Sequence, residues 1–224
     1  MTEELLLSTA YFPPAEWFSL IAQSRRVIIE KHENYHRQTY RNRCIIMGAN
    51  GPLPLIVPVQ KGSFHKTAIT DLRTDDSKRW RELHLRGITS AYAAAPFFEY
   101  YYDMIRDVIT THYSFLIDLN NAAITAVCEA IGIDAEIRYS DSFMPEGQRE
   151  MDYRYCISPK KPCMIKGYSD IQYVQVFGER FGFTPRLSII DILLNNGPGT
   201  LALLQRSLAA DNCNQPSEFQ SDCN

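Results

Sequence analysis

Short apolar runs that are typical of strands alternate along the chain with segments whose apolar residues recur at helical spacing. The strand-like runs cover residues 5–12, 25–32, 43–47, 53–59 and 133–140. Helical spacing predicts helices over 15–24, 76–95, 96–112, 119–131, 170–181 and 187–195, with a last helix that reaches Leu208. Because strands and helices are interleaved, the pattern predicts an α/β fold. "GANGP" (48–52) is a turn signal between two of the strands, so we expect a mixed β-sheet, with a parallel core plus a β-hairpin, flanked by helices.

The length of 224 residues favours a single domain, which we expect to span residues 1–208. Residues 209–224 have no periodicity and no basic residue, so we expect a disordered C-terminal tail. Truncation after Leu208 is therefore expected to leave the melting temperature almost unchanged.

Composition and charge exclude several classes of function. The net charge of −3 gives no support to nucleic-acid binding. The chain has no signal-peptide pattern and no apolar run of about 20 residues, so we expect a cytoplasmic protein without membrane insertion. There is no CxxC pair, no metal site is expected, and all six cysteines are expected to be reduced: Cys44, Cys128, Cys156, Cys163, Cys213 and Cys223. The sequence identifies neither a cofactor nor an oligomeric state.

A basic island interrupts this slightly acidic chain. Residues 31–43 carry four Lys or Arg residues and one Glu. If residues 41–45 extend as a strand, Arg41 and Arg43 share one face, and two guanidinium groups on one face can bind a phosphate or carboxylate. The alternative is a solvated strand edge whose charges deter aggregation. On the first interpretation the partner is a small anionic ligand, and Arg41→Ala is expected to weaken its binding with little loss of stability.

Two polar residues lie on apolar helix faces. His84 falls in the middle of the face formed by Trp80, Gly87 and Ile88, where it is either a hydrogen-bonded core residue or a pocket residue that transfers protons. Asp191 lies on a narrow polar line of the otherwise apolar segment "LSIIDILLNN" (187–196). It either fixes a loop or pairs with a buried arginine, or it faces a pocket.

The ordered set of segments resembles the WbqC-like protein family. The matching segments are "YFPPAEWF", "IEKHENYHRQTYRNRCII", "LPLIVPV", "RWRELHLRGITSAYAAAPFFEYYYD", "YVQVF" and "GFTPRLSIIDILLNNGP". They run in family order from about residue 5 to residue 205. The site residues that this resemblance implies are Tyr11, Glu30, Tyr35, Arg41, Asn42, Arg43, His84, Gln175 and Asp191. The sequence departs from the family pattern at His36 and Arg37, where related chains carry a long polar or basic residue followed by lysine.

The resemblance implies a role in bacterial surface-polysaccharide (O-antigen-type) biosynthesis, and it supplies no mechanism. The leading hypothesis is a cytosolic enzyme that transfers an acyl or aminoacyl group onto an amino sugar of a nucleotide sugar. In it His84 is the general base, Asp191 orients it or binds the sugar, and the two arginines hold the pyrophosphate or a donor carboxylate. The alternative is a non-catalytic accessory subunit that binds the same ligand. Nucleotidyl transfer is a second enzymatic alternative.

Overall fold

The computed structural model describes residues 4–60 and 67–208, and it confirms the α/β class. Three parallel strands, β1 (Leu5–Ser8), β2 (Arg26–Glu30) and β5 (Glu136–Tyr139), form one sheet in the order β1-β2-β5. The predicted hairpin consists of β3 (Arg43–Gly48) and β4 (Gly51–Ile56), which pair antiparallel as a separate sheet. Prolines at 52 and 54 place β4 at an edge, as the lost amide donors require.

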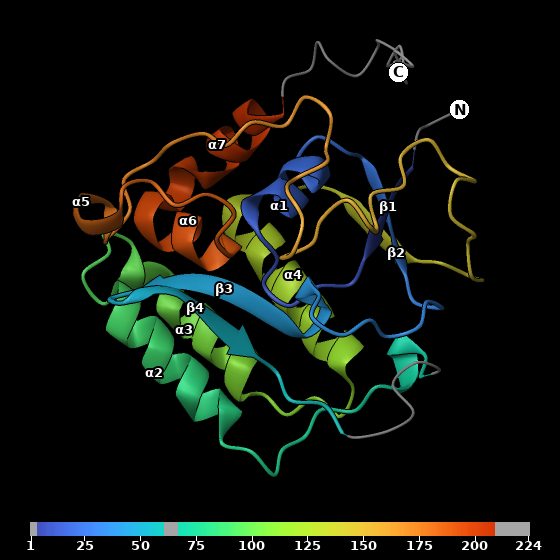
Figure 1. The fold of residues 1–224 in the computed structure, drawn as a ribbon, viewed down its shortest axis with the longest axis horizontal. Helices are drawn as coiled ribbons and strands as arrows, with labels where there is room; N and C mark the ends of the chain where they lie inside the picture. The colour runs from blue at the N-terminus through green and yellow to red at the C-terminus, as the bar shows by residue number, and fades with distance from the viewer. Residues whose placement is uncertain (1–3, 61–66, 209–224) are drawn as a thin grey trace, which may run out of the picture.

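Seven α-helices surround the two sheets in the described part of the chain. Their bounds are α1 (Ala15–Ile21), α2 (Trp80–Tyr92), α3 (Phe98–Thr110), α4 (Leu116–Ile131), α5 (Gly178–Phe181), α6 (Ile189–Asn196) and α7 (Thr200–Ser207). Figure 1 shows the hairpin between two helical layers, with α1, α6 and α7 on one side and α2 and α3 on the other. The parallel sheet lies beside the hairpin, at the opposite end of the molecule from α5 (Figure 1).

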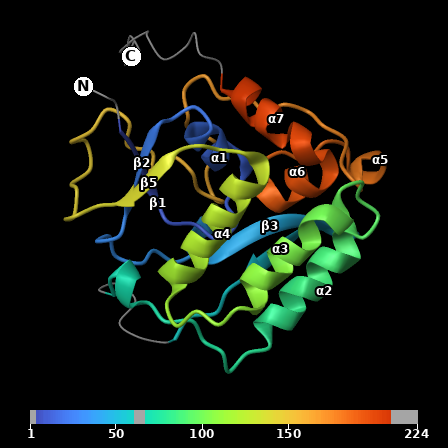
Figure 2. The same cartoon turned by 180° about the vertical axis from the view of Figure 1, so that it is seen from behind.

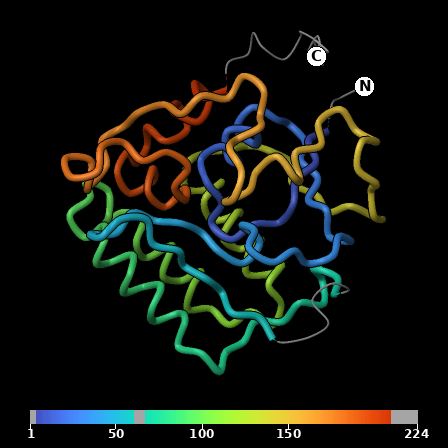
Figure 3. The backbone as a smooth tube through the Cα atoms, viewed as in Figure 1, coloured from blue at the N-terminus to red at the C-terminus, as the bar shows by residue number. Residues whose placement is uncertain are grey.

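The described helices cover only one face of the parallel sheet. In both views α1 and α4 lie on its inner side, and the irregular segment that follows β5 runs along its outer side (Figures 1 and 2). Burial agrees, because Leu5, Leu7, Val27 and Ile29 of the inner face belong to the hydrophobic core. The alternate residues of these strands point to the outer face. They include Leu6, Ile28 and Arg138, which are neighbours across the three strands. Figure 3 shows the chain after β5, in yellow to orange, passing this outer face.

Two predicted elements are wrong in part. The helix expected over 170–181 is formed only at α5, because the side chains before it point inward to hydrogen-bond acceptors instead of continuing a helical face. The strand predicted over 43–47 does begin at Arg43, but the extension back to Arg41 that a shared arginine face requires is absent, because residues 40–42 form a 3₁₀ turn. Arg41 and Arg43 therefore do not share a strand face.

Some expectations fall outside the described residues. The predicted disordered tail, 209–224, is among them, and so are Cys213 and Cys223. The other four cysteines are free in the structure, as expected.

The end of α6 generates a prediction about stability. Gly197 has a φ of 51°, and a Cβ atom there would lie 2.4 Å from Cδ1 of Phe97. Gly197→Ala is expected to cost about 2–4 kcal/mol in free energy of unfolding, because it adds backbone strain and a clash. Urea denaturation measures this, with Gly132→Ala as the matched control. Gly132 also has a positive φ, of 76°, but open space around it, so only about 1–2 kcal/mol is expected. Equal losses in the two variants would contradict the close approach to Phe97.

Candidate functional site

The carboxyl ends of the parallel strands carry polar side chains that face each other. Ser8 ends β1 and Glu30 ends β2, and the two residues are partners in the strand register. Ser140, directly after β5, donates a hydrogen bond from Oγ to Glu30 Oε1 at 2.6 Å. In open α/β sheets ligands bind outside the carboxyl ends of the strands, so this edge is the first place to look for a site.

A buried ion pair lies over the end of β1. The Arg41 guanidinium donates to Glu33 through both Nε (2.9 Å, to Oε1) and Nη2 (2.5 Å, to Oε2), and Nη2 also donates to Ser8 Oγ at 2.7 Å. Arg41 is 4% exposed and Glu33 1% exposed. Two parallel N–H···O bonds fix both the position and the plane of the guanidinium group.

A second ion pair lies over the end of β2. Arg154 donates to Asp152 through Nε and Nη2, and its Nη1 lies 3.4 Å from Glu30 Oε2. Glu30 also accepts the backbone N–H groups of His32 and Met144. The side chains of Glu30 and Arg154 have no exposed surface. We call the five residues of these ion pairs, together with Ser8, the carboxyl-edge cluster: Ser8, Glu30, Glu33, Arg41, Asp152 and Arg154.

The 3₁₀ turn at Tyr40–Asn42 positions Arg41. The Tyr11 backbone N–H donates to the Tyr40 carbonyl at 2.9 Å, and the Asn120 side chain in α4 donates to the Arg41 carbonyl at 2.8 Å. Asn42 donates from its side chain to the Val57 carbonyl at 2.9 Å. Tyr11 and Asn42, both predicted as site residues, therefore support this turn from the core.

The basic island does converge in space, although not along a strand. Tyr35 is buried, and burial raises the pKa of its phenol, while the positive charges of Arg43, Arg37 and Arg41 oppose that rise. The Nε atom of Arg43 is buried and makes no hydrogen bond to the described residues. Arg43 makes no ion pair among them either, in contrast to Arg41, so its guanidinium group is available to an anion.

Tyr155 lies at the exposed side of the carboxyl-edge cluster. Burial raises the pKa of its phenol, Glu33 adds to the rise, and Arg154 and Arg41 oppose it. The Arg154 guanidinium lies over the Tyr155 ring, 5.5 Å from its centroid, and the ring packs edge-on against His36. A small cavity of about 20 Å³, lined by Ser8, Arg41 and Arg154 among others, has room for about one water molecule.

His84 is bonded within the core. Its Nε2 lies 3.1 Å from the Ile56 carbonyl oxygen, which only accepts, so Nε2 carries the proton and donates. Its Nδ1 then accepts the hydroxyl hydrogen of Tyr11 at 3.0 Å. Burial lowers the pKa of His84 to about 4. The imidazole is thus neutral at pH 7, with both nitrogen atoms occupied.

Asp191 is satisfied by neutral donors. Its carboxylate accepts Tyr92 Oη at 2.7 Å, Tyr173 Oη at 2.5 Å and Gln175 Nε2 at 3.0 Å. Burial raises its pKa, and the three hydrogen bonds oppose the rise. Gln175 also exchanges hydrogen bonds with the backbone of Thr184. The network therefore fixes the segment before α6 to the core, and Asp191 has no ion-pair partner among the described residues.

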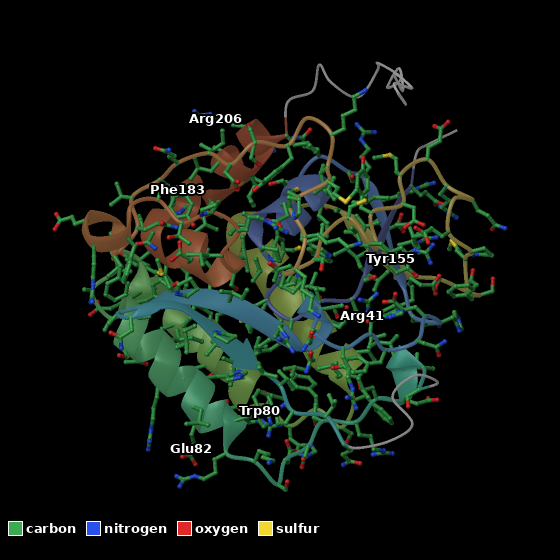
Figure 4. All side chains as sticks on the ribbon, viewed as in Figure 1. Arg41, Trp80, Glu82, Tyr155, Phe183 and Arg206 are labelled. Atoms are coloured by element: carbon green, nitrogen blue, oxygen red, sulfur yellow. The ribbon has the colours of Figure 1, made fainter. Side chains whose placement is uncertain are left out.

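The predicted site residues fall into three networks, two of which share Tyr11. Figure 4 marks them with Arg41, with Trp80, whose ring packs against His84, and with Phe183, whose ring packs against Tyr173. The three labelled residues lie well apart. The structure brings together Tyr11 with His84, Gln175 with Asp191, and Tyr35 with the three arginines. His84 also bonds to the carbonyl of Ile56, which is the cross-strand partner of Arg43, so its ring lies near the start of β3. Among the described residues no hydrogen bond or ion pair joins His84 or Asp191 to Arg41 or Arg43.

Sequence reasoning missed four members of the carboxyl-edge cluster: Ser8, Glu33, Asp152 and Arg154. Ser8 had a usable signal, because it ends a buried strand in a predicted parallel sheet. Asp152 and Arg154 lie in a segment without periodicity, so their pairing had no sequence signal.

The described residues contain neither a metal-binding cluster nor a membrane-spanning helix. No group of three or more His, Cys, Asp or Glu side chains is arranged to hold a metal ion. No helix in residues 4–60 and 67–208 has the length and apolar character needed to cross a membrane.

The buried Arg41–Glu33 pair corrects the expectation that changes at Arg41 leave stability intact. Removing one partner leaves the charge of the other buried and unpaired. Glu33→Gln is therefore expected to lower the free energy of unfolding by about 3–5 kcal/mol in urea denaturation. Glu82→Gln, which removes the exposed partner of Arg79, is the matched control and is expected to cost under about 1 kcal/mol. A loss at Glu33 as small as at Glu82 would show that the pair is not buried in solution.

His84 makes stability depend on pH. Its folded pKa of about 4 lies below its unfolded value of about 6.5, so its contribution is present above pH 6.5 and is lost as the pH falls towards 4. The loss is expected to reach about 3 kcal/mol. Urea denaturation at several pH values should show a shallower acid-side slope for His84→Gln than for wild type. A slope in His84→Gln as steep as that of wild type would contradict the lowered pKa.

Comparison of the sequence with known proteins identifies the family of this chain. The family model described as "WbqC-like protein family" matches residues 9–168, which include the whole carboxyl-edge cluster except Ser8 and exclude Gln175 and Asp191. The curated "Uncharacterized protein Rv1507c" of Mycobacterium tuberculosis (strain ATCC 25618 / H37Rv) is 28% identical over 221 residues, which cover 88% of this chain and 95% of the relative. No solved structure matches the chain. Since the family model covers well over half of the sequence, the chain belongs to the WbqC-like protein family.

Proposed function

We propose that this chain acts in bacterial surface-polysaccharide (O-antigen-type) biosynthesis and transfers an acyl or aminoacyl group onto an amino sugar of a nucleotide sugar. Family membership supports the general role. The Arg43 guanidinium, whose Nε has no hydrogen-bond partner among the described residues, supports an anionic ligand near the carboxyl end of the parallel sheet.

The observation that carries the proposal is the unpaired guanidinium of Arg43 beside Tyr35, next to the carboxyl-edge cluster. Arg41 is held by Glu33, so its charge is largely balanced and its position is fixed. Arg43 has no such partner in the described residues, and a phosphate would supply the hydrogen bond that its buried Nε lacks. The pyrophosphate of a nucleotide sugar has the charge and the acceptor oxygens for this position.

The general-base role predicted for His84 is not part of this proposal. Its two ring nitrogens are occupied by Tyr11 and Ile56, and its lowered pKa makes it a weak base at pH 7. Asp191 is likewise left out, because Tyr92, Tyr173 and Gln175 already occupy its carboxylate. We infer that both residues stabilise the fold around the site.

The same observation favours a second candidate, a non-catalytic accessory subunit that binds the nucleotide sugar. A binding protein needs the anion site but no base. Incubation with amino-sugar nucleotides and acyl donors such as acetyl-CoA, followed by mass spectrometry, distinguishes the two. A mass gain on the sugar nucleotide supports the transferase, whereas binding without any mass gain over a broad set of donors supports the subunit.

Arg43→Ala is the sharpest test of the anion site, because it removes a guanidinium group that holds no ion pair in the described structure. Isothermal titration with UDP-N-acetylglucosamine is expected to show affinity about 10- to 150-fold lower than wild type, which corresponds to about 1.5–3 kcal/mol for a charged hydrogen bond. Arg79→Ala, at an exposed position in a surface pair, is the matched control and should bind as wild type does. Unchanged affinity in Arg43→Ala would remove the basic island from the site.

A further inference from the structure

The helix-free face of the parallel sheet carries a groove of about 430 Å³, a volume in the range of small-molecule sites. Its floor is made by β2 and β5, including Ile28, Arg26 and Arg138, and its wall by the segment after β5. Among the described helices, none covers this face (Figures 1 and 2). The groove is distinct from the basic island, whose arginines do not line it.

Buried contacts hold the groove open. Met144 in the wall donates its backbone N–H to Glu30 at 2.9 Å, and its carbonyl accepts Arg154 Nη1 at 2.7 Å. Further along, the backbone groups of Met151 and Tyr153 pair with Leu6 of β1. The segment between these points is fixed at both ends and arches over the sheet, so the groove is a built feature of the fold.

The groove is polar but carries no net charge. Three arginines line it, and three carboxylates balance them: Arg26, Arg138 and Arg149 with Glu4, Glu136 and Asp141. Arg149 pairs with Glu4 at 2.9 Å, and both Arg26 and Arg138 pair with Glu136. An anion would have to compete with these carboxylates, and an apolar ligand would leave the charged groups without hydrogen bonds to water.

A neutral polyhydroxyl ligand avoids both penalties. Its hydroxyl groups both donate and accept, so they can match carboxylates, guanidinium groups and the side chains of Ser142 and Gln148 at once. Two of the residues that line the groove, Ser140 and Met144, each donate a hydrogen bond to Glu30 of the carboxyl-edge cluster. The groove therefore adjoins the carboxyl-edge cluster, of which Arg41 is a member.

We propose that this groove binds the sugar ring of the ligand, as an uncharged pyranose subsite beside the anion site. The inference deepens the proposed function and rests on it for the identity of the whole ligand. Binding of an isolated sugar does not depend on the anion site, and the two are therefore tested separately.

Saturation-transfer NMR with two fragments tests the subsite. N-acetyl-D-glucosamine is the neutral probe and UDP the anionic probe, each at about 10 mM, a concentration that detects millimolar affinity. Ser142→Trp fills the groove from an exposed position, and Glu150→Trp is the matched control, exposed on the same segment but outside the lining. Gln148→Ala is a second groove variant that removes hydrogen bonds without adding bulk.

We expect a saturation-transfer signal on N-acetyl-D-glucosamine with wild type, Glu150→Trp and Arg43→Ala. With Ser142→Trp this signal should be at least about five-fold weaker, and with Gln148→Ala it should fall by a smaller factor. The saturation-transfer signal on UDP should instead be lost in Arg43→Ala alone and retained in the groove variants. Absence of sugar binding to wild type, or equal sugar binding in wild type and both groove variants, would overturn the subsite. Loss of the sugar signal in Arg43→Ala alone would place the sugar at the basic island and would also overturn it. Absence of UDP binding would instead contradict the anion site and leave the sugar result to stand on its own.

Discussion

Five charged side chains are packed where the parallel strands end, and burial of charge is the constraint on which this region depends. An isolated ion in the interior is strongly unfavourable, so each charge requires an opposite one within hydrogen-bonding distance. Arg41 with Glu33, and Arg154 with Asp152 and Glu30, meet this requirement. Each pair joins segments that have little regular structure of their own. The pairs therefore help to determine the course of the chain over residues 31–42 and 141–154, where few side chains reach the hydrophobic core.

Two other buried polar groups, His84 and Asp191, are stabilised without an ion pair. His84 is kept neutral by burial, and Asp191 is surrounded by hydroxyl and amide donors instead of a cation. Such networks fix the hairpin and α6 against the core with specific geometry. They contain no group with spare hydrogen-bonding capacity towards a ligand, whereas Arg43 has an unused donor.

The sequence predicted well where periodicity carries the information. The strands at 5–8 and 26–30, the hairpin, and the helices at 80–92 and 116–131 follow from apolar spacing, and Gly132 ends its helix in the left-handed conformation as a C-terminal glycine should. The basic island was also found, because charge is visible in composition. Its geometry was not, since the turn at Tyr40–Asn42 is held by Tyr11 and Asn120 from distant parts of the chain. Arg154 was missed for the same reason: its partners Glu30 and Met144 are long-range contacts that no local pattern reports.

The buried pair of Glu33 and Arg41 also limits the routes by which this family can diverge. A lineage that changes one residue first passes through a protein with an uncompensated interior charge, so the two positions are tied together in evolution. Replacement of both by apolar residues is thermodynamically permitted, because a well-packed apolar pair often matches a buried ion pair in stability. Relatives that made this double exchange would retain the fold with an altered electrostatic field beside Arg43. They would serve as natural experiments on whether the pair exists for architecture or for the ligand.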